Sequence, residues 1–407
     1  WLENVRGSTP TVIENRFTPT RGALIMHADE TTVITQADTL IEENAGVVVM
    51  PTNSRMTARK LHKRYTDKYG KSAVVMIWQD NSESSEIQDF IAHIDERLQK
   101  LRVFIYSPSL GSGVDIQTPV RAVCALFNAV PLAASELHQL LGRARHPQET
   151  HVYVQTRRGN DETNVETIYQ RHLYNAIKTG QVCEFDAHGV IAVNETQRGF
   201  LRLCAMSEAA RARSMNDLRT HFLALARGYT LSERGGKDDG LKKELRELRE
   251  ALAADDKTAV LEAKAVDYEE LERLRTAGEV TPEIRAGHDK FKIEETVGAP
   301  LSSELYDQFH TPEQREELRA FTDLLDEPEA LKQGDREQAA DGVPLNKRTH
   351  RLTRRLLLKR LITDVFGELG LDSREELTEE EIEQRMTDYL TLHRHDLRHH
   401  FGHRADH

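Results

Sequence analysis

The sequence has little cysteine and no long apolar run. Its three cysteines, Cys124, Cys183 and Cys204, show no C-x-x-C spacing. They therefore predict neither a zinc site nor a disulfide framework, and they are typical of a reduced, cytoplasmic protein. No stretch approaches the roughly 18 consecutive apolar residues of a membrane span, and the N-terminus lacks a basic and then apolar signal region. We expect no association with a membrane.

The chain also lacks an excess of basic residues. Its 55 Lys and Arg are outnumbered by 67 Asp and Glu, which gives a formal net charge of -12 over 407 residues. This balance argues against a uniformly basic nucleic-acid coat but allows local basic patches. The length, with 38% hydrophobic and 30% charged residues, predicts two or three domains rather than one compact unit.

The sequence does contain an alternation of short apolar runs with amphipathic stretches. The runs lie at residues 23–26, 46–50, 73–78, 102–106, 122–127 and 151–154. This alternation predicts an α/β domain over residues 23–157, in which a parallel sheet is flanked by helices. Functional loops of such sheets lie at the carboxyl ends of the strands. We therefore searched the residues that follow each run.

Two of these loops carry hydroxyl and amide groups. Thr52, Asn53 and Ser54 follow the second run, and a helix cap there can hold a phosphate through backbone N–H groups. Taken alone, this segment reads more often as an ordinary strand-to-helix turn. The loop after the fourth run contains Ser107 and Ser109, whose hydroxyls can contact phosphate oxygens. It too can be read as a plain turn.

The second of these loops continues into Gly113 and Asp115. The glycine lets the backbone approach a ligand, and the carboxylate can accept from a ribose hydroxyl or orient a neighbouring loop. A third segment, after the fifth run, places Arg143 and Arg145 at the end of a helix. Arginines in this position suit the γ-phosphate of a nucleotide that a neighbouring domain holds, although such a pair is more often a solvated cap. Three phosphate-competent loops at successive carboxyl ends favour a common function.

Together these segments resemble motifs IV, V and VI of the second RecA-like domain of a superfamily 2 helicase. Motif V of that family runs T-x-x-x-x-x-G-x-D, and Ser107, Gly113 and Asp115 occupy its positions with Ser in place of Thr. The resemblance covers residues 40 to 157.

Motif VI of the family runs Q-x-x-G-R-x-x-R and is matched by Gln139, Gly142 and Arg143. Arg145 comes one residue earlier than the usual second arginine, which leaves open which arginine reaches the γ-phosphate. The shorter form is similar to plasmid replication proteins of the cyanobacterial type and to herpesvirus origin-binding helicases.

The resemblance implies a motor that uses ATP and Mg²⁺, held mainly by an upstream RecA-like domain of the same polypeptide, and DNA as a partner; an oligomer is compatible with it. A P-loop lysine and an acidic box are missing. Gly70-Lys71-Ser72 lies between a helix and a strand in the wrong order, and the Asp29-Glu30 pair is too close to the next run. Because the chain begins with Trp1, we expect the first motor domain to lie upstream. The implied roles are catalytic for Arg143, Arg145 and Gln139; nucleotide-binding for Gly113, Asp115 and Gly142; and DNA-binding for Thr52, Asn53, Ser54, Ser107 and Ser109.

The remaining chain is predicted to be mostly helical. A basic amphipathic segment in it contains Arg351, Arg354 and Arg355, which could contact DNA phosphates or form a solvated helix face. The histidine-rich C-terminus is read as a solvated end, and no metal is assigned. The predicted parts are 1–22, a linker from a missing domain; 23–157, the RecA-like domain; 158–230, a helical extension with a short hairpin; 231–240, a linker; 241–331, a helical domain; 332–346, a linker; and 347–407, the basic helical segment.

Two classes of function follow. The first is the C-terminal motor half of an ATP-dependent DNA helicase or translocase, acting in replication of a plasmid, phage or other mobile element. The second is a non-catalytic module that binds DNA or a replication partner through a degenerate helicase fold. Upstream sequence with a P-loop would select the first.

Overall fold

The computed structural model of the chain describes two compact units. By their internal contacts the first comprises Trp1–Leu173 with Glu184–His288, and the second Tyr174–Cys183 with Asp289–His407. The described residues are 22–79, 81–82, 84–110, 114–129, 132–156, 159, 161–178, 184–185, 191–192, 195–340, 351–366 and 378–393. No helix among them is long and apolar enough to cross a membrane.

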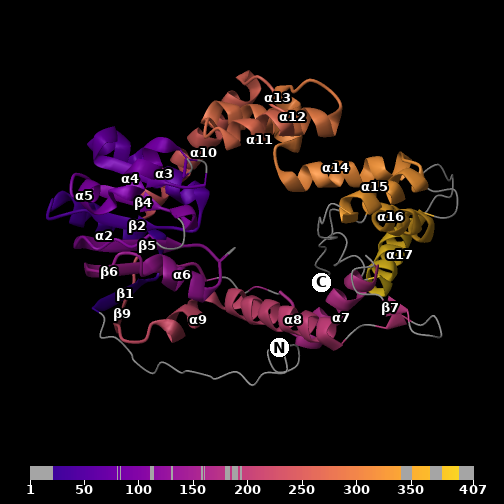
Figure 1. Cartoon of the computed structure of the whole chain (residues 1–407), viewed down its shortest axis with the longest axis horizontal. Helices are drawn as coiled ribbons and strands as arrows, with labels where there is room; N and C mark the ends of the chain where they lie inside the picture. The colour runs from indigo at the N-terminus through magenta and orange to yellow at the C-terminus, as the bar shows by residue number, and fades with distance from the viewer. Residues whose placement is uncertain are drawn as a thin grey trace. The chain divides into compact units, whose positions relative to one another are not determined.

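A seven-stranded sheet, parallel throughout, forms the centre of the first unit (Figure 1). Its strand order is β3-β4-β2-β5-β6-β1-β9. The predicted α/β class is confirmed, and the six apolar runs correspond to the first six strands. The strands are β1 (Ala23–His27), β2 (Val48–Pro51), β3 (Val74–Ile77), β4 (Val103–Tyr106), β5 (Val120–Phe127), β6 (Pro147–Val154) and β9 (Thr230–Arg234).

Alternate residues of each strand enter two cores, one on each face of the sheet. In β4, Val103 and Ile105 belong to one core and Phe104 and Tyr106 to the other, as the two-residue period of a strand requires. The first core includes residues of α2 (Glu30–Glu42), α3 (Arg55–Tyr69) and the start of α10 (Asp239–Glu262). The second includes residues of α4 (Ser85–Ala92), α5 (Ile94–Leu98), α6 (Ala134–Leu141) and α9 (Leu218–Leu225).

The seventh strand corrects the prediction of a linker over 231–240. Residues Thr230–Arg234 form β9, which pairs in parallel with β1 in the register Ala23↔Thr230 to His27↔Arg234. All of its residues are exposed, so the strand carries no apolar run that the sequence could reveal. The helix that follows then places Leu241 in the core against the sheet. Backbone pairing alone makes this segment part of the domain.

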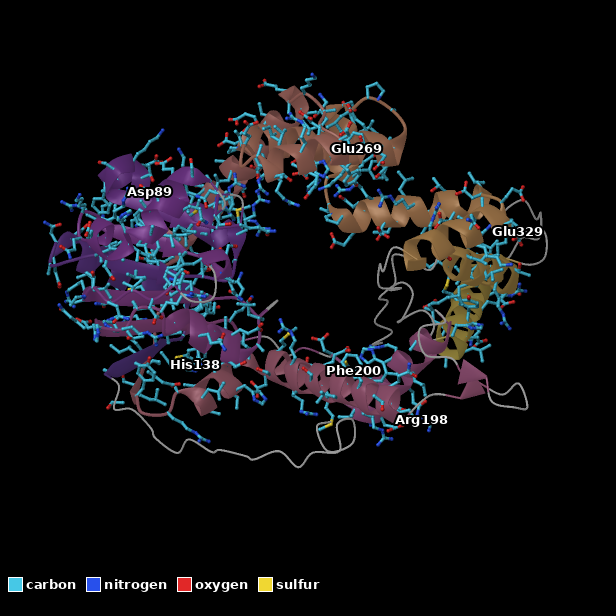
Figure 2. The ribbon with its side chains drawn as sticks, in the orientation of Figure 1. Asp89, His138, Arg198, Phe200, Glu269 and Glu329 are labelled. Atoms are coloured by element: carbon cyan, nitrogen blue, oxygen red, sulfur yellow. The ribbon has the colours of Figure 1, made fainter. Side chains whose placement is uncertain are left out.

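Helices dominate the rest of the first unit. α7 (Val165–Lys178) packs on α8 (Glu195–Asn216) through a small core that includes Ile168 and Ala209, and Phe200 of α8 is exposed (Figure 2). The predicted hairpin is present as the antiparallel pair β7 (Glu184–Phe185) and β8 (Ile191–Ala192), while its turn lies outside the described residues. α11 (Tyr268–Thr276) begins after the cap residue Asp267, and α12 (Pro282–Val297) continues into the second unit.

The described part of the second unit is built from helices. They are α13 (Ser303–Phe309), α14 (Pro312–Leu325), α15 (Pro328–Ala340), α16 (Arg351–Phe366) and α17 (Glu379–Leu392). Thr311 caps α14 by accepting from the backbone N–H of Gln314. The predicted linker 332–346 is wrong over 332–340, because α15 extends to Ala340; residues 341–346 lie outside the described residues.

A chain of polar side chains, centred on two buried histidines, links the neighbouring strands β1 and β6. His27 Nε2 lies 3.0 Å from His151 Nδ1, and His151 Nε2 lies 3.1 Å from a carboxylate oxygen of Glu149. The hydroxyl of Thr32 lies 2.9 Å from His27 Nδ1. The two histidines are 0% and 1% exposed. Burial lowers the pKa of His27 to about 4 and also lowers the pKa of His151, so both rings stay neutral in the folded protein.

This burial makes stability depend on pH. Between pH 6.5 and 4 the unfolded chain binds protons that the folded His27 does not, so the free energy of unfolding should fall as the pH drops through this interval. The full loss for His27 is roughly 3 kcal/mol. We expect His27→Leu to flatten the dependence measured by urea unfolding between pH 6.5 and 5. An unchanged slope in His27→Leu would contradict this account.

Candidate functional site

The candidate loops lie on two opposite edges of the sheet. In a parallel sheet, residues that follow a strand lie at the carboxyl edge and residues that precede one lie at the amino edge. Thr52–Ser54 and Ser107 follow β2 and β4, whereas Asp115 and the segment 142–146 precede β5 and β6. The expectation that all three loops share the carboxyl edge is wrong for the third, because α6 carries the chain back across the sheet before the arginines.

At the amino edge, the segments expected to act together are in direct contact. The backbone N–H of Ile116 donates to Arg143 O at 2.9 Å, and the N–H of Arg145 donates to Ile116 O at 3.0 Å. These bonds make a short parallel bridge between Ile116 and Ala144. Arg145 Nη2 also donates to Asp115 Oδ1 at 2.6 Å. Thus the carboxylate of one loop orients an arginine of the other.

The two arginines have different surroundings. Arg143 is half-buried: its Nη1 donates to Val114 O at 3.1 Å, and its Nε is buried without a hydrogen-bond partner. It also lies close enough to act on Tyr106, whose pKa burial raises and the positive charge of Arg143 partly lowers. Arg145 is exposed, with 49% of its side-chain surface accessible. Arg145 is therefore the more accessible of the two arginines, and Arg143 is tied to the backbone of the neighbouring segment.

The helix that precedes these arginines, α6, is held in place by contacts with α9. His138 of α6, labelled in Figure 2, stacks on Phe222 of α9 at 4.1 Å between ring centroids and lies 2.7 Å from Phe222 O. Gln139 is on the exposed side of α6. Gly142 ends the helix at a tight approach, since a Cβ there would lie 3.2 Å from His138 O. Gly113, the remaining predicted nucleotide contact, lies outside the described residues.

A cavity of about 520 Å³ opens beside the segment 142–146. Its lining includes Arg145, His146, Thr150 and Tyr229. Such a volume falls in the range of small-molecule sites. The amino edge therefore combines an exposed arginine with a hollow next to it.

The polar residues after β2 are used by the fold itself. Thr52 is fully buried, and its hydroxyl accepts from Ser54 N. Asn53 joins the ends of β2 and β5 through two bonds with Asn128, one to its carbonyl at 2.9 Å and one from its N–H at 2.7 Å. Ser54 caps α3 by accepting from Thr57 N. These contacts agree with the ordinary strand-to-helix turn, and DNA contact here stays a prediction.

Ser107 and Ser109 occupy the neighbouring turn at the same edge. The Ser107 hydroxyl accepts from the N–H of Ser109 at 3.4 Å, and the residue is 8% exposed. Its backbone N–H donates to Ile77 O, which ties the turn to the adjacent strand. The side chains of Ser107 and Ser109 thus lie at the carboxyl edge of the sheet, as the sequence predicts, but both are largely covered by neighbouring atoms.

The basic helix α16 does not present the predicted surface. Arg354 and Arg355 are only 5% and 7% exposed, so the prediction that they lie along DNA is wrong. Arg351 donates from Nε and Nη2 to Asp323 of α14, and Arg354 pairs with Glu316 of the same helix. A run of cations in the sequence cannot reveal acidic partners that lie about 30 residues away. These arginines join helices instead.

One aromatic residue at the carboxyl edge was missed. Trp78 ends the apolar run 73–78, which predicts it to be part of a strand, but β3 stops at Ile77. The guanidinium of Arg55 lies 4.8 Å from the centre of its ring. A tryptophan at the last position of an apolar run, just past the strand, is a signal that could have identified it.

No protein-family model matches the chain, and no curated protein is found to be similar. Among the described residues, no group of three or more His, Cys, Asp or Glu side chains is placed to bind a metal ion. The interpretation of the site therefore rests on its own geometry.

The role of Arg351 in joining helices can be tested by removing it. Arg351→Ala would leave Asp323, which is 1% exposed, as a buried carboxylate without its guanidinium. We expect the second unit to lose about 3 kcal/mol of stability in urea unfolding. The matched control is Arg360→Ala on the exposed face of the same helix, where loss of the pair with Asp364 should cost about 0.5 kcal/mol or less. Equal effects of the two changes would contradict the assignment.

Proposed function

We propose that the chain is the C-terminal motor half of an ATP-dependent DNA helicase or translocase that serves replication of a plasmid, phage or other mobile element. The observation that carries the proposal is the contact between the two amino-edge segments, in which Asp115 orients Arg145 at 2.6 Å. These are the segments that resemble helicase motifs V and VI. The all-parallel α/β sheet supports the same interpretation.

The position of Arg145 supports a nucleotide that is shared with another domain. Ligands of parallel α/β domains bind outside the carboxyl ends of the strands. An arginine at the amino edge of one domain can therefore meet a nucleotide that a second domain holds at its own carboxyl edge. In this arrangement Arg145 neutralises charge that develops on the γ-phosphate, and Arg143 positions the loop.

ATP and Mg²⁺ fit this division of roles. The residues of this chain that suit a nucleotide are the exposed Arg145, the adjacent Gly142 and the cavity beside them. Within the described residues no carboxylate cluster is arranged for a divalent cation, so the upstream domain would supply the Mg²⁺ ligands. When bound, Mg²⁺ would offset the charge of the β- and γ-phosphates, and the contribution of this chain is the guanidinium.

The proposal predicts a large effect of one arginine on ATP hydrolysis. In the full-length protein, Arg145→Ala should lower kcat for ATP by about 1000-fold or more, because the charge on the γ-phosphate loses its partner. Hydrolysis should be measured with and without single-stranded DNA, and DNA binding should be measured in parallel by fluorescence anisotropy. We expect DNA to stimulate the parent protein and Arg145→Ala to keep its DNA affinity.

The control is Arg202→Ala on the exposed face of α8, which removes an arginine paired with Glu166 far from the loop in sequence. It should hydrolyse ATP at the parent rate. Hydrolysis by Arg145→Ala at the parent rate would rule out the arginine finger. A full-length protein that binds DNA without hydrolysing ATP would instead support the non-catalytic module.

A further inference from the structure

A tryptophan and an arginine lie together at the carboxyl edge of the sheet. Trp78 follows β3, an edge strand, and Arg55 is the first residue of α3. The guanidinium carbon of Arg55 lies 4.8 Å from the centre of the Trp78 ring, within cation–π range. Arg55 is exposed and Trp78 is partly exposed. Phe104, Tyr106 and Phe127 of the same sheet, in contrast, are fully buried in its cores.

The turn that carries the tryptophan is held by an asparagine side chain. Asn81 Oδ1 accepts from the N–H of Trp78 at 2.9 Å, and Asn81 Nδ2 donates to Met76 O at 2.8 Å. The backbone N–H of Asn81 and that of Ser82 both donate to Trp78 O. These bonds fix the chain on both sides of the indole, so a partner that stacks on the ring would not have to order it first.

A second arginine completes the support. The guanidinium of Arg59 lies 5.8 Å from the centre of the Trp78 ring and makes two bonds with Asp256 of α10, one of them 2.7 Å long. Its charge is thus offset by that carboxylate, and its place is fixed. The side chain of Arg55 is exposed at the helix start. The cluster therefore joins a rigid aromatic surface to an exposed planar cation.

The neighbourhood of the cluster favours a chain that carries both bases and phosphates. Ser107 lies beside it, since the N–H of Ser107 donates to Ile77 O at 3.0 Å. Aromatic faces and guanidinium planes stack on unpaired bases, and exposed arginines contact phosphates. A duplex hides its base faces, so an edge-mounted indole suits a single strand.

We propose that Trp78 and Arg55 form a base-stacking platform for single-stranded nucleic acid at the carboxyl edge of the sheet. The platform rests on the proposed function, from which it takes the nucleic-acid substrate, and adds two residues that the motif resemblance does not include. Its position separates it from Arg145 at the amino edge, so each can be removed without altering the other. Bases stack on the indole in a sequence-tolerant way, and Arg55 secures the neighbouring phosphate or base.

The test uses the fact that the sequence has only two tryptophans. Trp1→Phe in the 407-residue chain leaves Trp78 as the only indole, and this protein is the reference. Titration with oligothymidylate of about 15 nucleotides, close to the largest single-domain site size, should quench its fluorescence through stacking. An abasic oligonucleotide of equal length should quench far less. Oligouridylate in a parallel titration distinguishes DNA from RNA as the strand.

Affinity provides the second measurement. In the Trp1→Phe background, Trp78→Ala should weaken oligothymidylate binding by about 5- to 150-fold and leave binding of the abasic strand unchanged. Trp78→Phe should recover part of the loss, and Arg55→Ala should weaken binding of both strands. The matched control is Phe321→Ala, which removes an aromatic side chain that is 65% exposed on α14, and should have no effect.

The outcomes separate this inference from the proposed function. Absence of quenching together with parent affinity in Trp78→Ala would overturn the platform, while the ATPase result for Arg145→Ala would stand unaffected. A full-length protein that does not hydrolyse ATP would remove the motor but leave the stacking platform intact. If Trp78→Ala fails to fold, as circular dichroism would show, quenching of the reference protein by oligothymidylate but not by the abasic strand still decides the question.

Discussion

Parallel pairing of every strand in the sheet is the constraint on which the rest of the structure depends. Each connection must return the chain to the opposite edge before the next strand can begin. Residues are thereby sorted by whether they follow or precede a strand. Asn53 and Trp78 fall on one edge for this reason, and Asp115 and Arg145 on the other. Loops that are successive in sequence need not be neighbours in space.

Much of this fold could be predicted from the sequence, because a buried parallel strand leaves a continuous apolar run. Runs at β1 to β6 carry that signal, and their order with the intervening helices gives the class. β9 carries none. Its residues are polar and exposed, and it is a strand only because β1, some 200 residues earlier, offers an unpaired edge. No local pattern in the sequence contains that information.

The sequence predicts which residue types the candidate site contains. It does not predict which residues from distant segments contact them. The pairing of the Asp115 and Arg145 segments agrees with their joint selection from the sequence, although the edge on which they lie was misjudged. The sequence predicts that Arg351 and Arg354 bind phosphates, because it does not reveal that they pair with Asp323 and Glu316 in the folded protein. The buried pair His27 and His151 was missed, since each histidine stands alone in its own strand. Ion pairs and hydrogen bonds between residues far apart in the sequence can be identified only from the folded structure.

β5 links the two edges and has a mechanical consequence. It begins four residues after Ile116, which is bridged to the arginine loop, and it ends next to Asn128, which is bonded on both sides to Asn53. Its eight residues span about 26 Å at the rise of a parallel strand. On the proposals above, the nucleotide and the nucleic acid would be too far apart to share a contact. Because β5 is hydrogen-bonded to other segments at both of its ends, a change at the nucleotide would reach the nucleic acid as a displacement of this strand along its axis.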